Sequence, residues 1–187
     1  SLREALRMLT LVGLVEGRRG QGTFVRSDVS EFFVEPPTWS AVLGPPELEE
    51  LLEARELVEV GLAGRAAERM TGEHKRELRG IVDTMAALVK QPSAFREADL
   101  QFHIKLAEAS GNRVLLRFVK TVRALIRPFA DKALSLSFRP DESLREHMML
   151  MECLEADDAV GARTAMLRHL TRAAEVIRSV QPGEPRN

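Results

Sequence analysis

Apolar residues along most of this chain recur three or four positions apart, which is the spacing of a helix with one buried side. From Pro46 onward six such segments follow one another, separated by turns rich in Gly, Pro, Asn and Asp. The expected helices cover residues 47–69, 73–89, 93–109, 113–133, 141–156 and 158–180. β-Branched residues are sparse in this region. The pattern therefore predicts a mainly all-α fold, built on a six-helix antiparallel bundle.

The first 27 residues follow a different pattern. Leu2, Leu6 and Leu9 have helical spacing, and Gly13 is a plausible stop for that helix. Two short apolar runs, 14–15 and 23–25, then flank a turn rich in Gly and Arg, as in a β-hairpin. We therefore expect a short helix and a small hairpin ahead of the bundle.

The segment between these two regions contains four prolines, which predict a linker. Its three aromatic residues, Phe32, Phe33 and Trp39, are apolar enough that we expect them to dock on another surface. The predicted organisation is an N-terminal unit at 1–27, a linker at 28–46, a helical domain at 47–180 and a disordered tail at 181–187.

Composition and charge support a globular protein with two kinds of surface. The chain is 44% hydrophobic and 29% charged, with a formal net charge of -1, so no global field attracts nucleic acid. Residues 1–27 carry five Arg and two Glu (+3), whereas residues 31–60 carry eight Glu and one Arg (-7). The single cysteine excludes an intrachain disulfide, and no stretch approaches the ~20 apolar residues of a membrane span. A cytoplasmic protein is expected.

Four residues with metal-binding side chains fall within apolar stripes of the predicted helices. Asp99 and His103 are one turn apart on the third helix, so both could reach one ion. His147 lies on the fifth helix and His169 on the sixth. One Asp and three His would suit a first-row divalent ion. Spacing alone favours a simpler interpretation, in which each His is a satisfied core residue and Asp99 bonds His103 within its helix.

Arg55 interrupts the apolar stripe of the first bundle helix. It could extend its charged end to the surface, or pair with Glu56 or Glu59. Four further residues with suitable chemistry are expected outside the site, either solvated or off the apolar stripe: His74, Glu146, Glu152 and Cys153.

Three motifs at the N-terminus carry a family resemblance. They are REALR at 3–7, GLVE at 13–16 and GQGTFV at 20–25, and in this order they resemble the second half of a winged helix-turn-helix domain of the GntR family of bacterial transcription regulators. The resemblance implies that the helix reads DNA and that the hairpin is the wing. The expected DNA contacts are Arg3, Arg7, Arg18, Arg19, Gly20 and Gly22. The first helices of that domain are absent and the chain begins without Met, so we expect further sequence upstream.

Residues 47–180 are similar to the FCD effector domain of the FadR-like branch of that family. The matching elements are LLEARELVEVGLAGRAAER at 51–69, Asp99-x3-His103, ASGN at 109–112, EH at 146–147 and RHL at 168–170. In metal-binding members such motifs supply one Asp and three His to a divalent ion. Here the implied ligands are Asp99, His103, His147 and His169.

The resemblance implies a homodimeric regulator of operator DNA that senses a small carboxylate, and not an enzyme. A hydroxy- or dicarboxylate would bind at the ion, with Arg55 holding its far carboxylate and Asn112 as a weaker contact. Zn²⁺ suits the ligand set best, while Ni²⁺, Mn²⁺ and Fe²⁺ stay open. Two alternatives also stay open: a metalloregulator for which the ion is the signal, and a metal-dependent hydrolase.

Overall fold

The structure is a computed structural model, and it describes residues 1–11, 15–25, 47–134 and 138–180. The chain divides into two compact units, Ser1–Glu47 and Leu48–Asn187. The predicted linker at 28–46, with its three aromatic residues, and the predicted tail at 181–187 lie outside the described residues.

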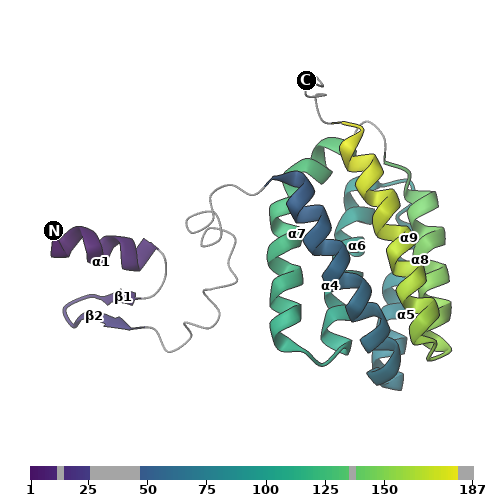
Figure 1. The fold of residues 1–187 in the computed structure, drawn as a ribbon, viewed down its shortest axis with the longest axis horizontal. Coiled ribbons are helices and arrows are strands. Elements are labelled where there is room, and N and C mark those ends of the chain that lie inside the picture. The colour runs from purple at the N-terminus through teal and green to yellow at the C-terminus, as the bar shows by residue number, and fades with distance from the viewer. Residues whose placement is uncertain (12–14, 26–46, 135–137, 181–187) are drawn as a thin grey trace. The chain divides into compact units, whose positions relative to one another are not determined.

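The N-terminal unit contains one helix and one hairpin (Figure 1). Helix α1 covers Leu2–Leu11, and strands β1 (Val15–Arg18) and β2 (Gly22–Val25) pair antiparallel, with Arg18 opposite Gly22. Gly20 and Gly22 have φ of +76° and +104°, a region that glycine enters without steric cost. The predicted short helix and hairpin are confirmed.

The second unit is a bundle of six described helices that pack lengthwise against one another (Figure 1). They are α4 (Leu48–Arg69), α5 (Gly72–Ala87), α6 (Pro92–Ala109), α7 (Arg113–Leu134), α8 (Pro140–Glu155) and α9 (Ala159–Arg178). Each predicted boundary lies within two residues of the observed one. None of the helices in the described part of the chain is long and apolar enough to cross a membrane.

Local sequence explains where these helices begin. Thr71 accepts a hydrogen bond from the His74 backbone N–H while the His74 ring accepts one from Thr71, which together cap α5. Asp158 caps α9 by accepting from Gly161 N. Pro92 and Pro140 occupy the first positions of α6 and α8, where a missing N–H costs nothing.

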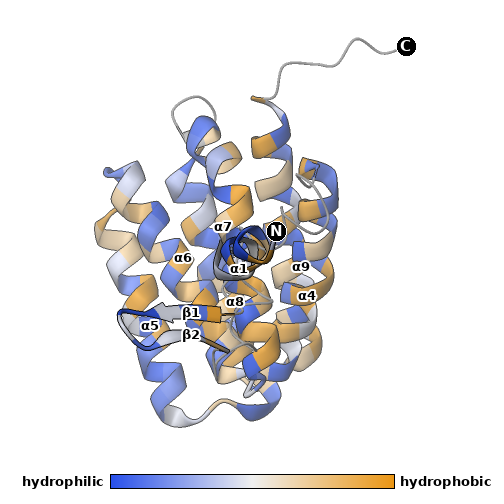
Figure 2. Cartoon of the chain, turned by 90° about the vertical axis from the view of Figure 1, so that its left-hand side faces the viewer, coloured by the Kyte–Doolittle hydropathy of each residue, from blue (hydrophilic) through white to orange (hydrophobic). Residues whose placement is uncertain are grey.

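The helices are two-sided, as Figure 2 shows by the polar and apolar positions that alternate around each of them. Their apolar sides form a main core around Phe95, Phe102 and Leu106, between α4, α5, α6, α8 and α9. A second cluster lies where α4 begins and α9 ends. We call it the end cluster; it consists of Leu51, Leu52, Val122, Ile126, Ala133, Ala174, Ile177 and Val180.

Candidate metal centre

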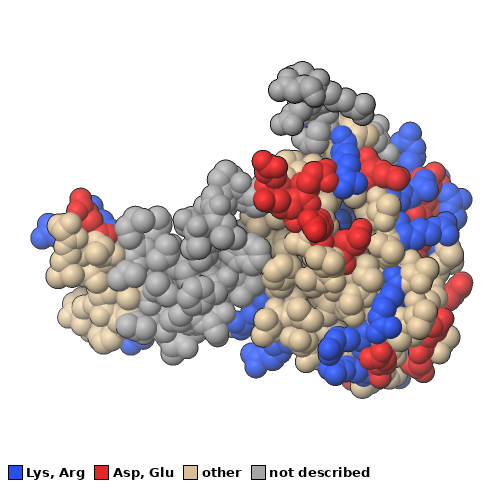
Figure 3. All heavy atoms as spheres, viewed as in Figure 1, with Lys and Arg blue, Asp and Glu red and all other residues tan. Residues whose placement is uncertain are grey.

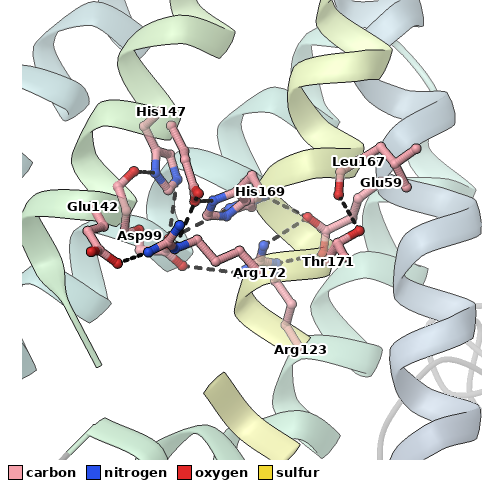
Figure 4. A network of polar contacts seen from close by, with 12 residues as sticks. Glu59, Asp99, Arg123, Glu142, His147, Leu167, His169, Thr171 and Arg172 are labelled. Carbon is pink, nitrogen blue, oxygen red and sulfur yellow. Dashed lines mark hydrogen bonds and ion pairs between the residues drawn. The ribbon is translucent and has the colours of Figure 1, made fainter. Parts of the chain in front are cut away.

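The four predicted ligand residues come together inside the bundle, from α6, α8 and α9. One donor atom from each of Asp99, His103, His147 and His169 lies within 4.8 Å of the others. The three imidazoles are buried, and the Asp99 side chain is 16% exposed. In Figure 4, Asp99, His147 and His169 point toward one another. Whether each His is instead satisfied separately in the core, as the simpler interpretation has it, depends on the hydrogen bonds that these side chains make.

Two of the imidazoles have their tautomer set by a neighbour. His147 Nδ1 lies 2.8 Å from the carbonyl oxygen of Ser143, which can only accept, so Nδ1 carries the hydrogen. His169 Nδ1 lies 3.1 Å from a carboxylate oxygen of Glu146, which favours the same tautomer. Both rings therefore present the lone pair of Nε2 to the centre.

The third imidazole has an acidic neighbour on the same ring atom. His103 Nδ1 lies 2.6 Å from Glu59 Oε2, although the contact lacks the alignment of a hydrogen bond. A carboxylate at Nδ1 again favours a lone pair on Nε2. All three Nε2 atoms are buried without a hydrogen-bond partner in the described part of the chain. Buried polar atoms without partners are rare and costly.

Asp99 makes this arrangement unfavourable without a cation. Its Oδ1 lies 3.2 Å from His147 Nε2 and 3.8 Å from His103 Nε2. Two lone-pair acceptors at such distances repel each other unless a positive charge lies between them. Donors bound to one ion at 2.0–2.2 Å are at most about 4.4 Å apart, when they lie on opposite sides of the ion. The four donor atoms, which lie within 4.8 Å of one another, need to move only slightly closer together, so the residues fit a divalent ion.

A buried ion-pair network adjoins these ligands. Arg123 holds Glu59 with two contacts of 2.8 Å and reaches Asp99 Oδ2 at 3.3 Å. Arg55 donates to Glu59 at 3.1 Å, so one of its predicted pairings is present. Two arginines and two carboxylates balance in charge. Burial favours the neutral acid, but the charge of Arg123, with His103 and Arg55, holds the pKa of Glu59 well below its usual range.

The environment disfavours the protonated form of two of the imidazoles, His103 and His169. Burial lowers the pKa of His169 well below its usual value, and the neighbouring His147 and His103 add to this effect. Burial also lowers the pKa of His103, followed by the charge of Arg123. A neutral imidazole is the form that binds metal.

A cavity of about 230 Å³ opens beside Asp99 and His169. Seven basic and three acidic side chains line it, a formal excess of +4 with His neutral. The bases are Arg55, Arg96, Lys120, Arg123, Arg127, Arg139 and Arg172, and the acids are Asp99, Glu142 and Glu146. Arg172 is paired with Glu142 and Arg96 with Asp131. The rest of the wall is largely apolar.

Residues 50–172 match the family model described as "FCD domain". The chain belongs to this family. It is 28% identical to the HTH-type transcriptional regulator LutR of Bacillus subtilis (strain 168), over 95% of this chain and 83% of that protein. It is 32% identical to the putative L-lactate dehydrogenase operon regulatory protein of Escherichia coli (strain K12), over 91% of this chain and 69% of that protein.

Solved structures agree with this assignment. Streptococcus agalactiae GntR matches with a TM-score of 0.62 and 25% identity, over 93% of this chain and 80% of that one. The FCD chain is thus a FadR-like transcriptional regulator of the GntR type with an effector-binding domain, and its relatives are regulators and not enzymes. DNA is its implied partner.

The regulator's expected DNA-contacting residues lie on the N-terminal unit. Arg3, Arg7 and Arg19 are exposed. Arg18 pairs with Glu16 at 2.6 Å, and its guanidinium lies 5.0 Å from the centre of the Phe24 ring. Because both contacts hold the Arg18 side chain on the hairpin, it is less free to reach a phosphate than the other arginines.

Two expectations about the regulator's bundle need correction. Glu146 was expected to be solvated, but it is buried against His169, because α8 packs on both α9 and α5 and so has two covered sides. Asn112 does not line the cavity; its side-chain oxygen accepts from the N–H groups of Val114 and Leu115 and caps α7.

Glu59 and Arg123 were not proposed as site residues from the sequence. A signal was present, because both interrupt apolar stripes: Glu59 follows Arg55 by one turn, and Arg123 follows the buried Val119 by one turn. Cys153 is half-buried against the main core and is not part of the ligand group, and Glu152 is exposed, as expected.

Proposed function

We propose that this regulator binds a divalent metal ion through Asp99, His103, His147 and His169, and that a small carboxylate bound beside the ion changes its affinity for operator DNA. The observation that carries the proposal is the set of three buried Nε2 atoms that surround the Asp99 carboxylate and have no hydrogen-bond partner among the described residues. A zinc ion suits this donor set best. The bound ion would supply a Lewis-acidic anchor for the effector's carboxylate.

The distribution of charge around the centre supports a carboxylate as the effector. The network of Arg55, Arg123, Glu59 and Asp99 is already balanced, so a divalent ion adds two uncompensated charges to a buried region. An anionic ligand offsets that charge, and the basic excess around the cavity acts in the same direction. We therefore expect the effector to bind the metal-loaded protein more tightly than the metal-free protein.

The names of relatives point to the same chemical class. Two of them are named for the L-lactate dehydrogenase operon and the galactonate operon. L-Lactate and galactonate differ in the rest of the molecule but share a 2-hydroxycarboxylate head. A hydroxycarboxylate can offer a carboxylate and a hydroxyl oxygen to one ion.

Arg55 provides a route from the cavity to DNA binding. It lines the cavity and belongs to α4, the helix that follows the predicted linker. An effector that changes the Arg55–Glu59 contact would shift the start of α4. In a homodimer, which we propose as the active form, such a shift would alter the separation of the two recognition helices, and operator half-sites require a fixed separation.

Operator binding under four conditions tests this proposal: metal-loaded or chelated protein, each with and without L-lactate at fixed salt. We expect lactate to change operator affinity only when metal is bound. His169→Ala should lose metal and lactate sensitivity together, whereas His74→Ala, at the cap of α5, should keep both. If operator affinity follows the metal alone and no carboxylate changes it, the regulator senses the ion itself.

A further inference from the structure

We infer that the effector carries an apolar alkyl or aryl body on its carboxylate head, in contrast to a sugar acid or a dicarboxylate. The inference rests on the proposed function, because it assigns the head to the metal end of the cavity. It is carried by a change in wall chemistry along the cavity, from ligands and charges at one end to core side chains at the other.

Two helices show this change. On α9, His169 and Arg172 line the cavity first, and Val176 and Ile177 line it two turns later, roughly 10 Å along the helix. On α7, Arg123 lies at the charged end and Ile126 begins the apolar part. Leu100, Ile104, Ala124, Ala130, Ala133, Phe138 and Ala173 complete the apolar lining.

The apolar part is continuous with the end cluster. Ile126 and Ile177 belong to that cluster and are 3% and 4% exposed, and Val176 packs against it. A hydroxyl group placed among these side chains would lose water and find no acceptor, which disfavours a polyhydroxylated ligand. A methylene chain or ring would bury apolar surface there instead.

The basic side chains near this part do not favour a second carboxylate. Arg96 is paired with Asp131. Arg127 is 56% exposed and lies within 4.0 Å of both Glu97 and Asp131. Their charges are therefore compensated or screened by water. Arg139 also lines the cavity; it is exposed and donates to the Phe138 carbonyl oxygen at 3.3 Å, so water screens its charge. The buried charge of a bound metal would be at the opposite end.

Size favours the same ligand class. A cavity of about 230 Å³ corresponds to roughly eight waters at the liquid density of ~30 Å³ each. L-Lactate has a single methyl group beyond its head and would leave the apolar part unfilled. Leu51 and Leu52, in the first turn of α4, belong to the end cluster, so a longer body would also pack closer to the helix that follows the linker.

Three probes with the same 2-hydroxycarboxylate head test the inference on the zinc-loaded protein: L-lactate, 2-hydroxyhexanoate and gluconate. Isothermal titration calorimetry gives each Kd. The alkyl probe has three more methylenes than lactate, so full burial predicts up to about 50-fold tighter binding. Gluconate has as many carbons as 2-hydroxyhexanoate, but its chain is hydroxylated, so it should bind no tighter than lactate.

Val176→Thr keeps the shape of the wall and adds a hydroxyl, so it should reduce the advantage of 2-hydroxyhexanoate over lactate by several-fold. Val160→Thr makes the same change on α9 at a position that is 71% exposed, and it should leave that advantage intact. Equal binding of all three probes, or tightest binding of gluconate, would overturn the inference while leaving a carboxylate effector in place. Binding of zinc without binding of any probe would overturn the proposed effector function itself.

Discussion

Replacing Arg123 by Leu should destabilise the metal-free protein strongly and the metal-loaded protein less. Arg123 binds both oxygens of Glu59 at 2.8 Å and one oxygen of Asp99 at 3.3 Å. Its side chain is 8% exposed and that of Glu59 only 4%. Leu fills similar space but leaves the buried Glu59 and the partly buried Asp99 with less neighbouring positive charge, supplied by Arg55.

The expected loss follows from that imbalance. Removing one partner of a buried ion pair costs roughly 3–5 kcal/mol, because the remaining charge stays buried without compensation. Arg55 still contacts Glu59 at 3.1 Å, so we expect the lower end, about 3 kcal/mol, in chelated protein. A divalent ion at Asp99 would replace part of the missing positive charge, so the loss should be smaller when metal is bound.

Urea unfolding followed by circular dichroism, with and without chelator, measures both losses. Arg127→Leu is the matched control: it lies one turn further along α7, its side chain is 56% exposed, and its contacts of 3.9 and 4.0 Å predict a change below about 1 kcal/mol. A loss for Arg123→Leu no larger than that of the control, or an equal loss with and without metal, would refute the reasoning.

Three further predictions concern the ligands and the DNA-binding unit. Folding lowers the pKa of His169, so the stability of metal-free protein should be retained above the unfolded pKa of about 6.5 and should decrease as the pH falls below that value. Urea melts that show no loss toward acid pH would contradict this prediction. Glu146→Gln should weaken metal binding about 10- to 100-fold, measured by competition with a chromophoric chelator, because Glu146 contacts His169 Nδ1. Glu152→Gln, at an exposed position of the same helix, should leave the metal affinity unchanged. Equal metal affinities of the two variants would remove Glu146 from the site. Arg7→Ala should weaken operator binding and, if Arg7 contacts a phosphate, reduce the slope of log affinity against log salt by about one. Fluorescence anisotropy measures the affinity, and Arg65→Ala, at an exposed position of the bundle, is the control. Equal operator affinities of the two variants would exclude a DNA contact by Arg7.

The helices and their approximate ends could be predicted from sequence because turn residues and apolar spacing act locally. Thr71, Asp158 and the prolines at 92 and 140 determine helix starts without reference to the rest of the fold. The four candidate ligand residues could also be proposed from sequence, since each interrupts an apolar stripe. Spacing could not show whether their donor atoms converge, which depends on how α6, α8 and α9 pack.

The partners of the ligands were harder to predict. Glu146 lies off the stripe that contains His147 and reads as solvated when α8 is considered alone. It is covered because α9 packs on that side, a fact of tertiary structure. Asn112 shows that a polar residue at a helix start can serve the local cap, because its side-chain oxygen accepts from Val114 and Leu115. A polar residue inside a stripe was the reliable signal, and it would also have identified Glu59 and Arg123.

The acidic side chains that gather near the start of α4, seen in Figure 3, contrast with the basic cavity behind that helix. Glu49 and Glu53 line a second, outer cavity that also reaches Arg55. An anionic ligand approaching on that side would be repelled, whereas the rim with Lys120 and Arg127 would attract it.

The ligands of the centre come from three helices that are separated along the chain, and this has a kinetic consequence. Asp99 and His103 on α6 meet His147 and His169 only after α8 and α9 have packed against α6. An ion could therefore bind only late in folding, so it would slow unfolding far more than it would speed folding. A metal-loaded molecule would therefore unfold more slowly than a metal-free one.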